Sequence, residues 1–361
     1  MFLPRFTITN KVLTQIGKIE SARETVEFAP LLLEWEEKFR QDALIRTVYF
    51  GCHLEGSELT LSSSEKIVKE DPGRDESAEV VAKNLAIVGR ERDIQLAMNY
   101  RNVARYIDQL ARLGRKTGIA FSEKESFQIH SLLLEKIIPS NQLGIYRIGL
   151  VADQTEKLPS PPLPVEVPYQ MEDFWIWLKN IDDAVVHPVL VAGIAFVEIV
   201  RMQPFSQGNE MMARLIPSLV LAAKGYDNKR FFCLEDYLDK NTAVYGEAMR
   251  ETAIKAELTE WLEFYTTALA TEMSKVKENV RRLSIDNLSS TNLVGQVALT
   301  ERQLALLSAL KMKEELTMAE ARRVLPMVSD DTILRDLIVL MGKKLIKRKG
   351  NTKGARYILR K

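Results

Sequence analysis

The sequence predicts a mainly α-helical protein, on three observations. Apolar residues recur at spacings of three and four along most of the chain, as between residues 93 and 113. Glycine-bounded runs of β-branched and aromatic residues, which are typical of strands, occur only at residues 144–152 and near the C-terminus. The 361 residues are 46% hydrophobic and 27% charged, as in ordinary folded proteins. At roughly 150 residues per domain, this length suits two or three domains.

The composition excludes several classes of protein. Fifty Lys and Arg residues against 49 Asp and Glu residues give a net charge of +1, so the chain is not basic throughout. Cys52 and Cys233 are too few for a disulfide framework, and with three histidines they form no zinc-ligand spacing. No apolar run approaches the roughly 18 residues needed to span a bilayer, and no apolar stretch of a secretion signal follows the N-terminus. We expect a cytoplasmic protein that makes no membrane contact.

Proline, glycine and small polar residues divide the helical pattern. Residues 71–75 (Asp-Pro-Gly-Arg-Asp) form a turn cluster, and residues 158–164 (Leu-Pro-Ser-Pro-Pro-Leu-Pro) form a loop that no helix can cross. Just before that loop, residues 144–152 are expected to form a short β-hairpin. A long polar helix is expected to end near Leu283, because residues 284–292 are rich in Ser, Asn, Asp and Thr. We predict a domain linker there.

The C-terminal residues are predicted to form a small domain of three helices and a hairpin. Residues 300–310 and 317–324 each begin with a threonine that can cap a helix, and Ser329 can cap a third helix. Residues 343–349 and 355–359 follow as two strands joined by a turn. Three helices followed by a two-stranded hairpin are typical of a winged helix-turn-helix.

The C-terminal charge suggests a nucleic-acid partner. Residues 329–361 carry ten Lys and Arg residues against three Asp residues, a net charge of +7, which leaves −6 for the rest of the chain. A basic wing is typical of phosphate contact with DNA. The candidate DNA-binding residues are Lys343, Lys344, Lys347, Arg348, Lys349, Lys353 and Arg356. Alternatively, these residues only solvate a domain that packs on a protein partner, because Asp330, Asp331 and Asp336 would oppose phosphates in a groove.

A polar segment between two apolar helices is the candidate reaction site. Residues 201–214 read Arg-Met-Gln-Pro-Phe-Ser-Gln-Gly-Asn-Glu-Met-Met-Ala-Arg and join a helix at 189–202 to a helix at 210–224. Free backbone N–H groups at such a helix start favour anions. The segment resembles the signature H-P-F-[D/E]-x-G-N-G-R-x-x-R of the Fic family, whose members transfer AMP from ATP to protein hydroxyls. The resemblance implies nucleotide-binding residues at Pro204, Phe205, Gly208, Asn209, Glu210 and Arg214.

Two further segments resemble the same family. Tyr146-Arg147, followed by the Pro-rich loop, is similar to the flap hairpin on which a target protein docks by strand addition. Residues 51–56 (Gly-Cys-His-Leu-Glu-Gly) are similar to the inhibitory motif [S/T]-x-x-x-E-[G/N] of a class that often carries a winged helix. In that class the motif's glutamate pairs with the last signature arginine, so Glu55 with Gly56 is implied to inhibit through Arg214. The alternative is a structural ion pair, which we favour.

The resemblance also implies the domain organisation. The N-terminal helical region with the inhibitory-type helix is expected at residues 1–110 and the Fic-like helical domain with its hairpin flap at residues 111–275. A linker helix and loop are expected at residues 276–297, and the winged helix-turn-helix at residues 298–361. Family members often form dimers, so the resemblance leaves a homodimer open.

The signature departs from the family pattern at four positions. Gln203 replaces the catalytic histidine, and a neutral amide cannot act as a general base. Ser206 replaces the acidic Mg²⁺ ligand, so no metal ligand is expected. Glu210 replaces a glycine and places a carboxylate, able to cap the free N–H groups, at the helix start meant for phosphates. Met211 replaces an arginine that would clamp phosphate.

Two functions remain open on the sequence. The first is a degenerate Fic protein without efficient AMP transfer or a cofactor, acting as a DNA-associated regulator or as a scaffold for an unknown target protein at the flap. The second is a divergent transferase that binds ATP and Mg²⁺, in which Gln203 only orients a hydroxyl that is already activated. His53, His130 and His187 are expected to be structural, and Cys233 is expected to be buried.

Overall fold

The computed structural model describes residues 2–360 apart from residues 30, 32, 118–121, 152–160, 256, 290–299, 314, 327, 344 and 351–354. Contacts divide the chain into two units. The first comprises Met1–Glu27 and Lys38–Lys277, and the second comprises Phe28–Glu37 and Glu278–Lys361. The N-terminal region predicted at residues 1–110 and the Fic-like domain predicted at residues 111–275 therefore fall mostly within one compact unit.

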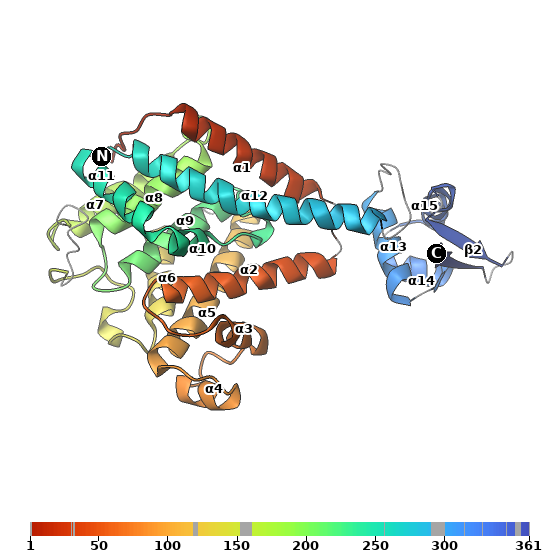
Figure 1. The fold of residues 1–361 in the computed structure, drawn as a ribbon, viewed down its shortest axis with the longest axis horizontal. Helices are drawn as coiled ribbons and strands as arrows, with labels where there is room; N and C mark the ends of the chain where they lie inside the picture. The colour runs from red at the N-terminus through yellow and green to blue at the C-terminus, as the bar shows by residue number, and fades with distance from the viewer. Residues whose placement is uncertain are drawn as a thin grey trace. The chain divides into compact units, whose positions relative to one another are not determined.

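The first unit is helical, which confirms the predicted mainly α class (Figure 1). Its helices are α1 (Asn10–Phe28), α2 (Leu33–His53), α3 (Leu61–Glu70), α4 (Ala78–Asn84), α5 (Glu91–Thr117), α6 (Glu123–Leu134), α7 (Val167–Asn180), α8 (Pro188–Met202), α9 (Asn209–Ala223), α10 (Leu234–Lys240), α11 (Thr242–Lys255) and α12 (Thr259–Ser289). Two short 3-10 turns, η1 (Ser140–Gln142) and η2 (Asn228–Arg230), join them. The ends of α1 and α12 and the start of α2 extend into the second unit.

Helix α8 lies at the centre of the first unit. All residues from Pro188 to Val200 are buried, as expected of a helix that is apolar on every side. Helix α9 packs on α8, α5 and α6. Helix α12 approaches α8 at Gly193, where an added Cβ would lie 2.9 Å from both Leu262 Cδ2 and Tyr265 Cδ1. Trp261 Nε1 donates to the Gly193 carbonyl oxygen at 2.7 Å, so α8 is held on both sides.

One predicted helix end differs in the structure, and one predicted hairpin is only partly covered by the described residues. Helix α12 continues beyond Leu283 to Ser289. Ser, Asn and Asp cost a helix only a few tenths of a kcal/mol each, so a long helix can extend through them. Residues 144–151 contain turns and bends without a strand, and residues 152–160 lie outside the described residues, so the flap hairpin stays a prediction.

The second unit contains three helices and a small antiparallel sheet. Its elements are α13 (Glu301–Lys313), β1 (Glu315–Thr317), α14 (Met318–Val324), α15 (Asp330–Gly342), β2 (Ile346–Lys349) and β3 (Arg356–Leu359). The strand order is β1-β3-β2, so β2 is an edge strand. Thr317 caps α14 in a reciprocal capping box with Glu320, as the sequence suggested for that helix start. Strand β1 was not predicted.

The helices of the first unit are held by a shared apolar core, and the second unit has an apolar core of its own. In the part of the chain that the structure describes, no helix has both the length and the apolar character needed to cross a membrane.

Candidate functional site

The loop at residues 203–208 is shaped by two residues with positive φ. Helix α8 ends at Met202, and Gln203 follows in the left-handed region with φ 41° and ψ 62°. This conformation costs a residue other than glycine roughly 1–2 kcal/mol. Gly208 has φ 77°, and a Cβ there would lie 2.8 Å from Leu134 Cδ1, so only glycine fits. Gln203, which stands where the family signature has its histidine, therefore has a strained backbone conformation.

Asn209 holds the loop closed from the first turn of α9. Its Oδ1 atom accepts from the Phe205 main-chain N–H at 2.9 Å, and its Nδ2 atom donates to the Phe205 carbonyl oxygen at 2.9 Å. The Phe205 ring is fully buried and stacks on His130 with centroids 4.0 Å apart. The loop thus keeps a single defined shape.

His130 links the loop to the segment before the flap. Its Nδ1 atom accepts from the Gly144 main-chain N–H at 3.0 Å, so Nε2 carries the proton and donates to the Gln207 carbonyl oxygen at 3.1 Å. Burial lowers the pKa of His130 to about 4, so the ring is neutral at pH 7. His130 is structural, as the sequence suggested.

Arg147 fixes the start of the loop through the backbone. Its Nε atom donates to the Gln203 carbonyl oxygen at 2.7 Å, and its main-chain N–H donates to the Pro204 carbonyl oxygen at 2.9 Å. A further bond of 2.5 Å joins Nη2 to the Pro162 carbonyl oxygen. The side chain is buried, and burial lowers its pKa. Arg147 therefore connects α8, the loop and the Pro-rich segment.

Tyr146 also points inward. Its hydroxyl donates to Glu123 Oε1 at 2.6 Å and accepts from Trp175 Nε1 at 3.2 Å. The side chains of Tyr146 and Arg147 thus hold the protein's own helices and loop. The role of this segment in docking a target protein stays a prediction.

The site offers poor ligands for a metal ion. Ser206 Oγ donates to Gln142 Oε1 at 3.1 Å, so the neutral hydroxyl at the expected ligand position already has a partner. Among the described residues, no three His, Cys, Asp or Glu side chains gather as a metal site. The donor set does not suit Mg²⁺, which requires carboxylate or phosphate oxygens.

The carboxylate of Glu210 does not cap the start of α9 as expected. It accepts from the Tyr245 hydroxyl on α11 at 3.0 Å, which draws the side chain away from the helix axis. Burial, and then the charge of Glu210, raise the pKa of Tyr245 well above its ordinary value, so the phenol stays a donor. Met211, next along α9, is buried with 3% of its surface exposed. Glu210 and Met211, which replace the signature's glycine and arginine, are therefore both held by contacts within the protein.

Glu55 and Arg214 form an ion pair, as the resemblance implied. Glu55 lies in the turn that ends α2, where Gly56 adopts φ 75°. Arg214 Nη2 lies 2.6 Å from Glu55 Oε1 and 3.5 Å from the Gly51 carbonyl oxygen. The Arg214 side chain is only 6% exposed. Burial alone would lower the pKa of Arg214, but Glu55 and then Tyr100 raise it, so the guanidinium keeps its charge.

A second acid lies behind this ion pair and was missed from the sequence. Tyr100 donates to Glu235 Oε1 at 3.1 Å, and both side chains are buried. Burial raises the pKa of Glu235. Tyr100 also supports α2 directly, since a Cβ on Gly51 would lie 2.5 Å from its Cζ atom. The available signal was an acidic pair, Glu235-Asp236, directly after the apolar residues 231–234.

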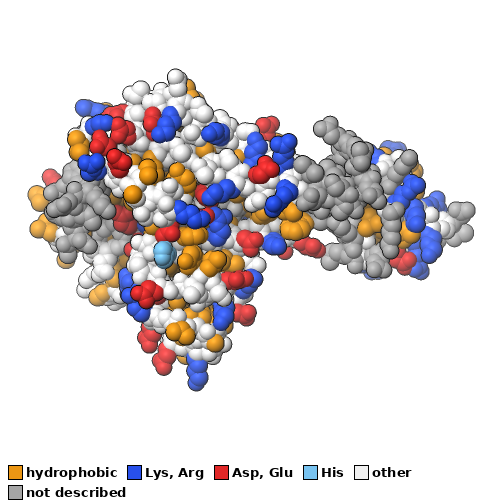
Figure 2. All heavy atoms as spheres, viewed as in Figure 1, with side chains coloured by type: hydrophobic (Ala, Val, Ile, Leu, Met, Phe, Trp, Pro, Cys, Tyr) orange, Lys and Arg blue, Asp and Glu red, His pale blue; other side chains and the backbone are white. Residues whose placement is uncertain are grey.

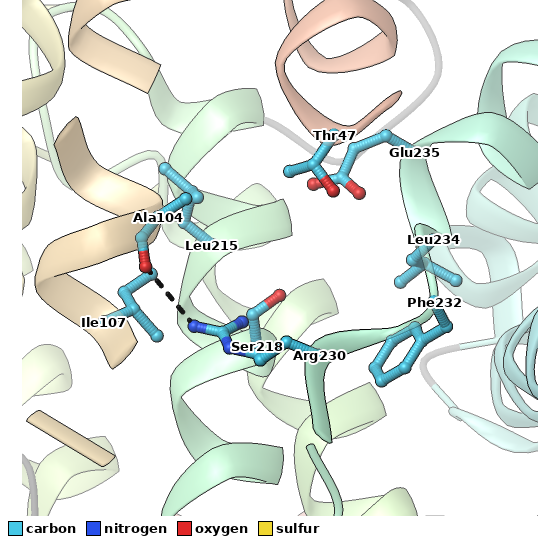
Figure 3. Close-up of a pocket in the computed structure, with 9 residues that line it drawn as sticks. All are labelled: Thr47, Ala104, Ile107, Leu215, Ser218, Arg230, Phe232, Leu234 and Glu235. Atoms are coloured by element: carbon cyan, nitrogen blue, oxygen red, sulfur yellow. Dashed lines mark hydrogen bonds between the residues drawn. The ribbon is translucent and has the colours of Figure 1, made fainter. Parts of the chain in front are cut away.

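Glu235 also lines a small cavity of about 40 Å³ (Figure 3). Its walls are Thr47, Ala104, Ile107, Leu215, Ser218, Arg230, Phe232, Leu234 and Glu235. Thr47 and Glu235 lie close together on one side, and Arg230 Nη2 donates to the Ala104 carbonyl oxygen at 3.5 Å on the other. This volume would hold roughly three water molecules and is too small for a nucleotide.

The remaining histidines and cysteines have structural surroundings. His53 Nδ1 lies 2.6 Å from Asp239 Oδ1. His187 precedes α8 and caps it, with Nδ1 accepting from the Val189 main-chain N–H at 3.3 Å. Cys52 and Cys233 are buried, and burial raises the pKa of both thiols, so neither is a reactive thiolate.

The basic residues expected to contact DNA are only partly gathered. Lys347, Arg348 and Lys349 are exposed along β2, and Arg356 on β3 forms an ion pair with Glu315. Lys343 caps the end of α15. Lys344 and Lys353 lie outside the described residues. Figure 2 shows Lys and Arg side chains gathered over the part of the second unit where Figure 1 labels α15 and β2.

Fold and site together define a helical domain in which a hydrogen-bonded loop joins two buried helices, the second of which carries the arginine of an arginine-glutamate pair. Residues 120–221, which include α8, the loop and most of α9, match the model of the Fic/DOC family. Residues 120–221 are therefore a Fic domain, as the signature in the sequence suggested.

Known relatives are distant. "Protein adenylyltransferase Fic" of Nematostella vectensis is 24% identical over 241 residues, which cover 64% of this chain and 51% of that protein. The protein of the same name from Drosophila melanogaster is 26% identical over 187 residues, which cover 52% of this chain and 34% of that protein. This chain thus matches about half of the first relative and about a third of the second.

Solved structures share the fold. A Fic family protein from Desulfovibrio desulfuricans G20 superposes with a TM-score of 0.61 at 21% identity, covering 99% of this chain and 98% of that one. Fic-1 of C. elegans, residues 134–508, superposes with a TM-score of 0.58 at 17% identity, covering 74% of this chain and 71% of that one.

Proposed function

We propose that this chain is a degenerate Fic protein that lacks efficient AMP transfer and acts by binding, as a DNA-associated regulator or a protein scaffold. The observation that carries the proposal is Gln203. This neutral amide stands at the position of the signature's catalytic histidine, in a loop whose backbone keeps a defined shape. A positioned general base typically contributes 10²–10⁴-fold to rate, and an amide has no proton affinity near pH 7 to replace it.

Two further losses support the proposal. Ser206 is a neutral hydroxyl already bonded to Gln142, so it offers Mg²⁺ no charge. Met211 is an apolar, buried side chain where the family signature has a phosphate-binding arginine, and Glu210 adds a negative charge beside it. Each loss weakens binding of a triphosphate independently of the missing base.

In this proposal the Glu55–Arg214 pair is structural. The pair joins the end of α2 to α9 and is nearly buried, so removing Glu55 would leave an uncompensated charge in the core. A catalyst that has lost its base has no need of an inhibitor. The retained pair is therefore explained by stability.

The second unit supports the binding role. We interpret this unit as a winged helix-turn-helix, and the interpretation is supported by its three helices, its edge strand β2 and the exposed Lys347, Arg348 and Lys349 on that strand. Such units contact nucleic acid through a helix and a wing.

Calorimetry with ATP and Mg²⁺ tests the proposal. We expect no binding to the wild type or to Glu55→Gly, because neither has a metal ligand or a phosphate-binding arginine at position 211. Asn209→Ala in the Glu55→Gly background is the control for binding at the loop. Binding that disappears in this control would demonstrate a working nucleotide pocket and contradict the proposal.

The alternative is a divergent AMP transferase, and the intact loop favours it. The paired bonds between Asn209 and Phe205 and the positive φ of Gly208 keep the loop in one shape, although the base is lost. Under this alternative, ATP labelled on the α-phosphate transfers its label to a protein in lysate, and Asn209→Ala abolishes the transfer.

A further inference from the structure

Several basic side chains in the helices and in the central strand of the second unit already have a carboxylate partner. Four ion pairs account for them: Arg302–Asp336, Lys313–Glu320, Arg322–Asp330 and Arg356–Glu315. Arg322 binds its carboxylate through two nitrogens, Nε at 2.8 Å and Nη2. A paired guanidinium or ammonium attracts an external anion weakly, because the nearby carboxylate cancels its field.

Strand β2 differs from these elements. Lys347, Arg348 and Lys349 are all exposed, and none has a carboxylate within ion-pair distance among the described residues. Because β2 is an edge strand, its outer side is open to a ligand.

The pairing register places two of these cations on one face. Lys347 lies opposite Ile358 and Lys349 opposite Arg356, whereas Arg348 lies opposite Tyr357, whose side chain is buried in the core. Lys347 and Lys349 therefore project together from the solvent side of the sheet, roughly 7 Å apart. Arg348 projects from the opposite face of the same edge strand, so β2 presents exposed cations on both of its faces.

Helix α15 offers few groups that could read bases. A helix in the major groove reads bases with residues near its N-terminus, yet α15 begins with Asp330 and Asp331. Its exposed residues further along are the apolar Leu334, Ile338 and Val339 and the cation Arg335. The apolar side chains offer no hydrogen bonds to base edges, and Asp331 would repel the phosphates that flank a groove. Arg335 is therefore the residue of α15 that tests base reading.

We propose that the second unit binds the phosphate backbone of duplex DNA through Lys347, Arg348 and Lys349 and does not select base sequence. The inference rests on the DNA association proposed above and names its mode. Three neutralised phosphates give a slope of about −2.7 for log affinity against log salt, a loss of roughly 40-fold between 50 and 200 mM salt.

The test measures fluorescence anisotropy of the full chain with three unrelated duplexes of equal length. We expect affinities within about threefold of one another and the salt slope given above. Lys347→Gln with Lys349→Gln should reduce the slope by about 1.8, because two phosphate contacts are lost. The matched control is Lys83→Gln with Lys179→Gln, which removes the same charge from exposed sites of the first unit and should leave binding unchanged.

The outcomes separate the two proposals. Binding that differs more than tenfold among the duplexes, or that falls more than tenfold in Arg335→Gln on α15, would mean that the helix reads bases and would overturn the inference alone. Equal loss in the β2 variant and its control would also overturn it, because the effect would then be one of net charge. Absence of binding to every duplex at 50 mM salt would overturn the DNA association itself.

Discussion

At the scale of single residues, His130 joins three parts of the site and does so only in its neutral form. It accepts from Gly144, donates to Gln207 and stacks on Phe205. Protonation would place a second N–H against the Gly144 N–H and a charge in the core. Because burial lowers the folded-state pKa from 6.5 to about 4, the unfolded chain binds a proton first as the pH falls. Stability is therefore present above about pH 6.5 and is lost as the pH falls toward 4.

The predicted loss from this group is about 2 kcal/mol between pH 7 and pH 4.5. Urea unfolding of the wild type and of His130→Gln at both pH values measures it. The glutamine variant is expected to be less stable at pH 7, since the ring stack is lost, but to lose about 2 kcal/mol less on acidification. Parallel pH dependence of the two proteins would contradict the assigned protonation state. The carboxyl groups that both proteins contain titrate in both, so their contribution to the pH dependence of stability cancels when the two proteins are compared.

At the scale of elements, α8 and α12 pack so closely that glycine is required between them. An alanine methyl at Gly193 would lie 2.9 Å from Leu262 and from the ring of Tyr265. Gly17 in α1 is the matched control, because nothing lies within 4 Å of an added Cβ there. Gly17→Ala should raise the free energy of unfolding by about 0.5–1 kcal/mol through helix propensity. Gly193→Ala should lower the free energy of unfolding by about 1 kcal/mol, because the cost of overpacking against α12 exceeds the gain in helix propensity. If thermal or urea unfolding showed that both variants change the free energy of unfolding in the same direction, the close approach of α8 and α12 would be refuted.

The elements show what local sequence can and cannot predict. The starts of α14 and α15 followed from Thr317 and Ser329, because residues of these types favour the position before a helix. Thr317 caps α14 through its side chain, whereas Ser329 occupies the N-cap position of α15 without a side-chain bond to a main-chain N–H group. Strand β1 has three residues between two helices, too few to show an alternating pattern. Its pairing with β3, some 40 residues later, depends on tertiary contact.

Contacts between residues far apart in the sequence were likewise not predictable at the candidate site. The loop residues could be predicted, because they are contiguous and resemble a known signature. The bonds from Arg147 to Gln203 and from Tyr100 to Glu235 join residues 56 and 135 positions apart, and no local spacing encodes them. Arg147 was assigned to target docking from its resemblance to the family's flap, and that role stays a prediction. The sequence did not indicate that its guanidinium is buried against backbone carbonyls.

At the scale of the whole molecule, the question is whether the scaffold still supports the family's chemistry. We expect that the combined substitutions Gln203→His, Ser206→Asp, Glu210→Gly and Met211→Arg, in a Glu55→Gly background, restore transfer of label from α-phosphate-labelled ATP to the protein itself. The physical reason is that Asn209, Gly208 and Arg147 already hold the loop backbone, so only side chains need replacing. Rate enhancement in phosphoryl transfer comes mainly from positioning and charge, which these residues would supply again.

The restored chain has a predictable cost. Met211 is buried, so an arginine there adds an unpaired charge to the core, and the removal of Glu55 leaves Arg214 unpaired as well. We therefore expect the variant to unfold at a lower temperature than the wild type and to be stabilised by ATP with Mg²⁺, whose phosphates would pair with both arginines. The control, Asn209→Ala in the restored chain, should lose both the label and the ATP-dependent stabilisation. A restored chain that is folded and bound to ATP but transfers no label would show that divergence extends beyond the loop, into the helices that support it.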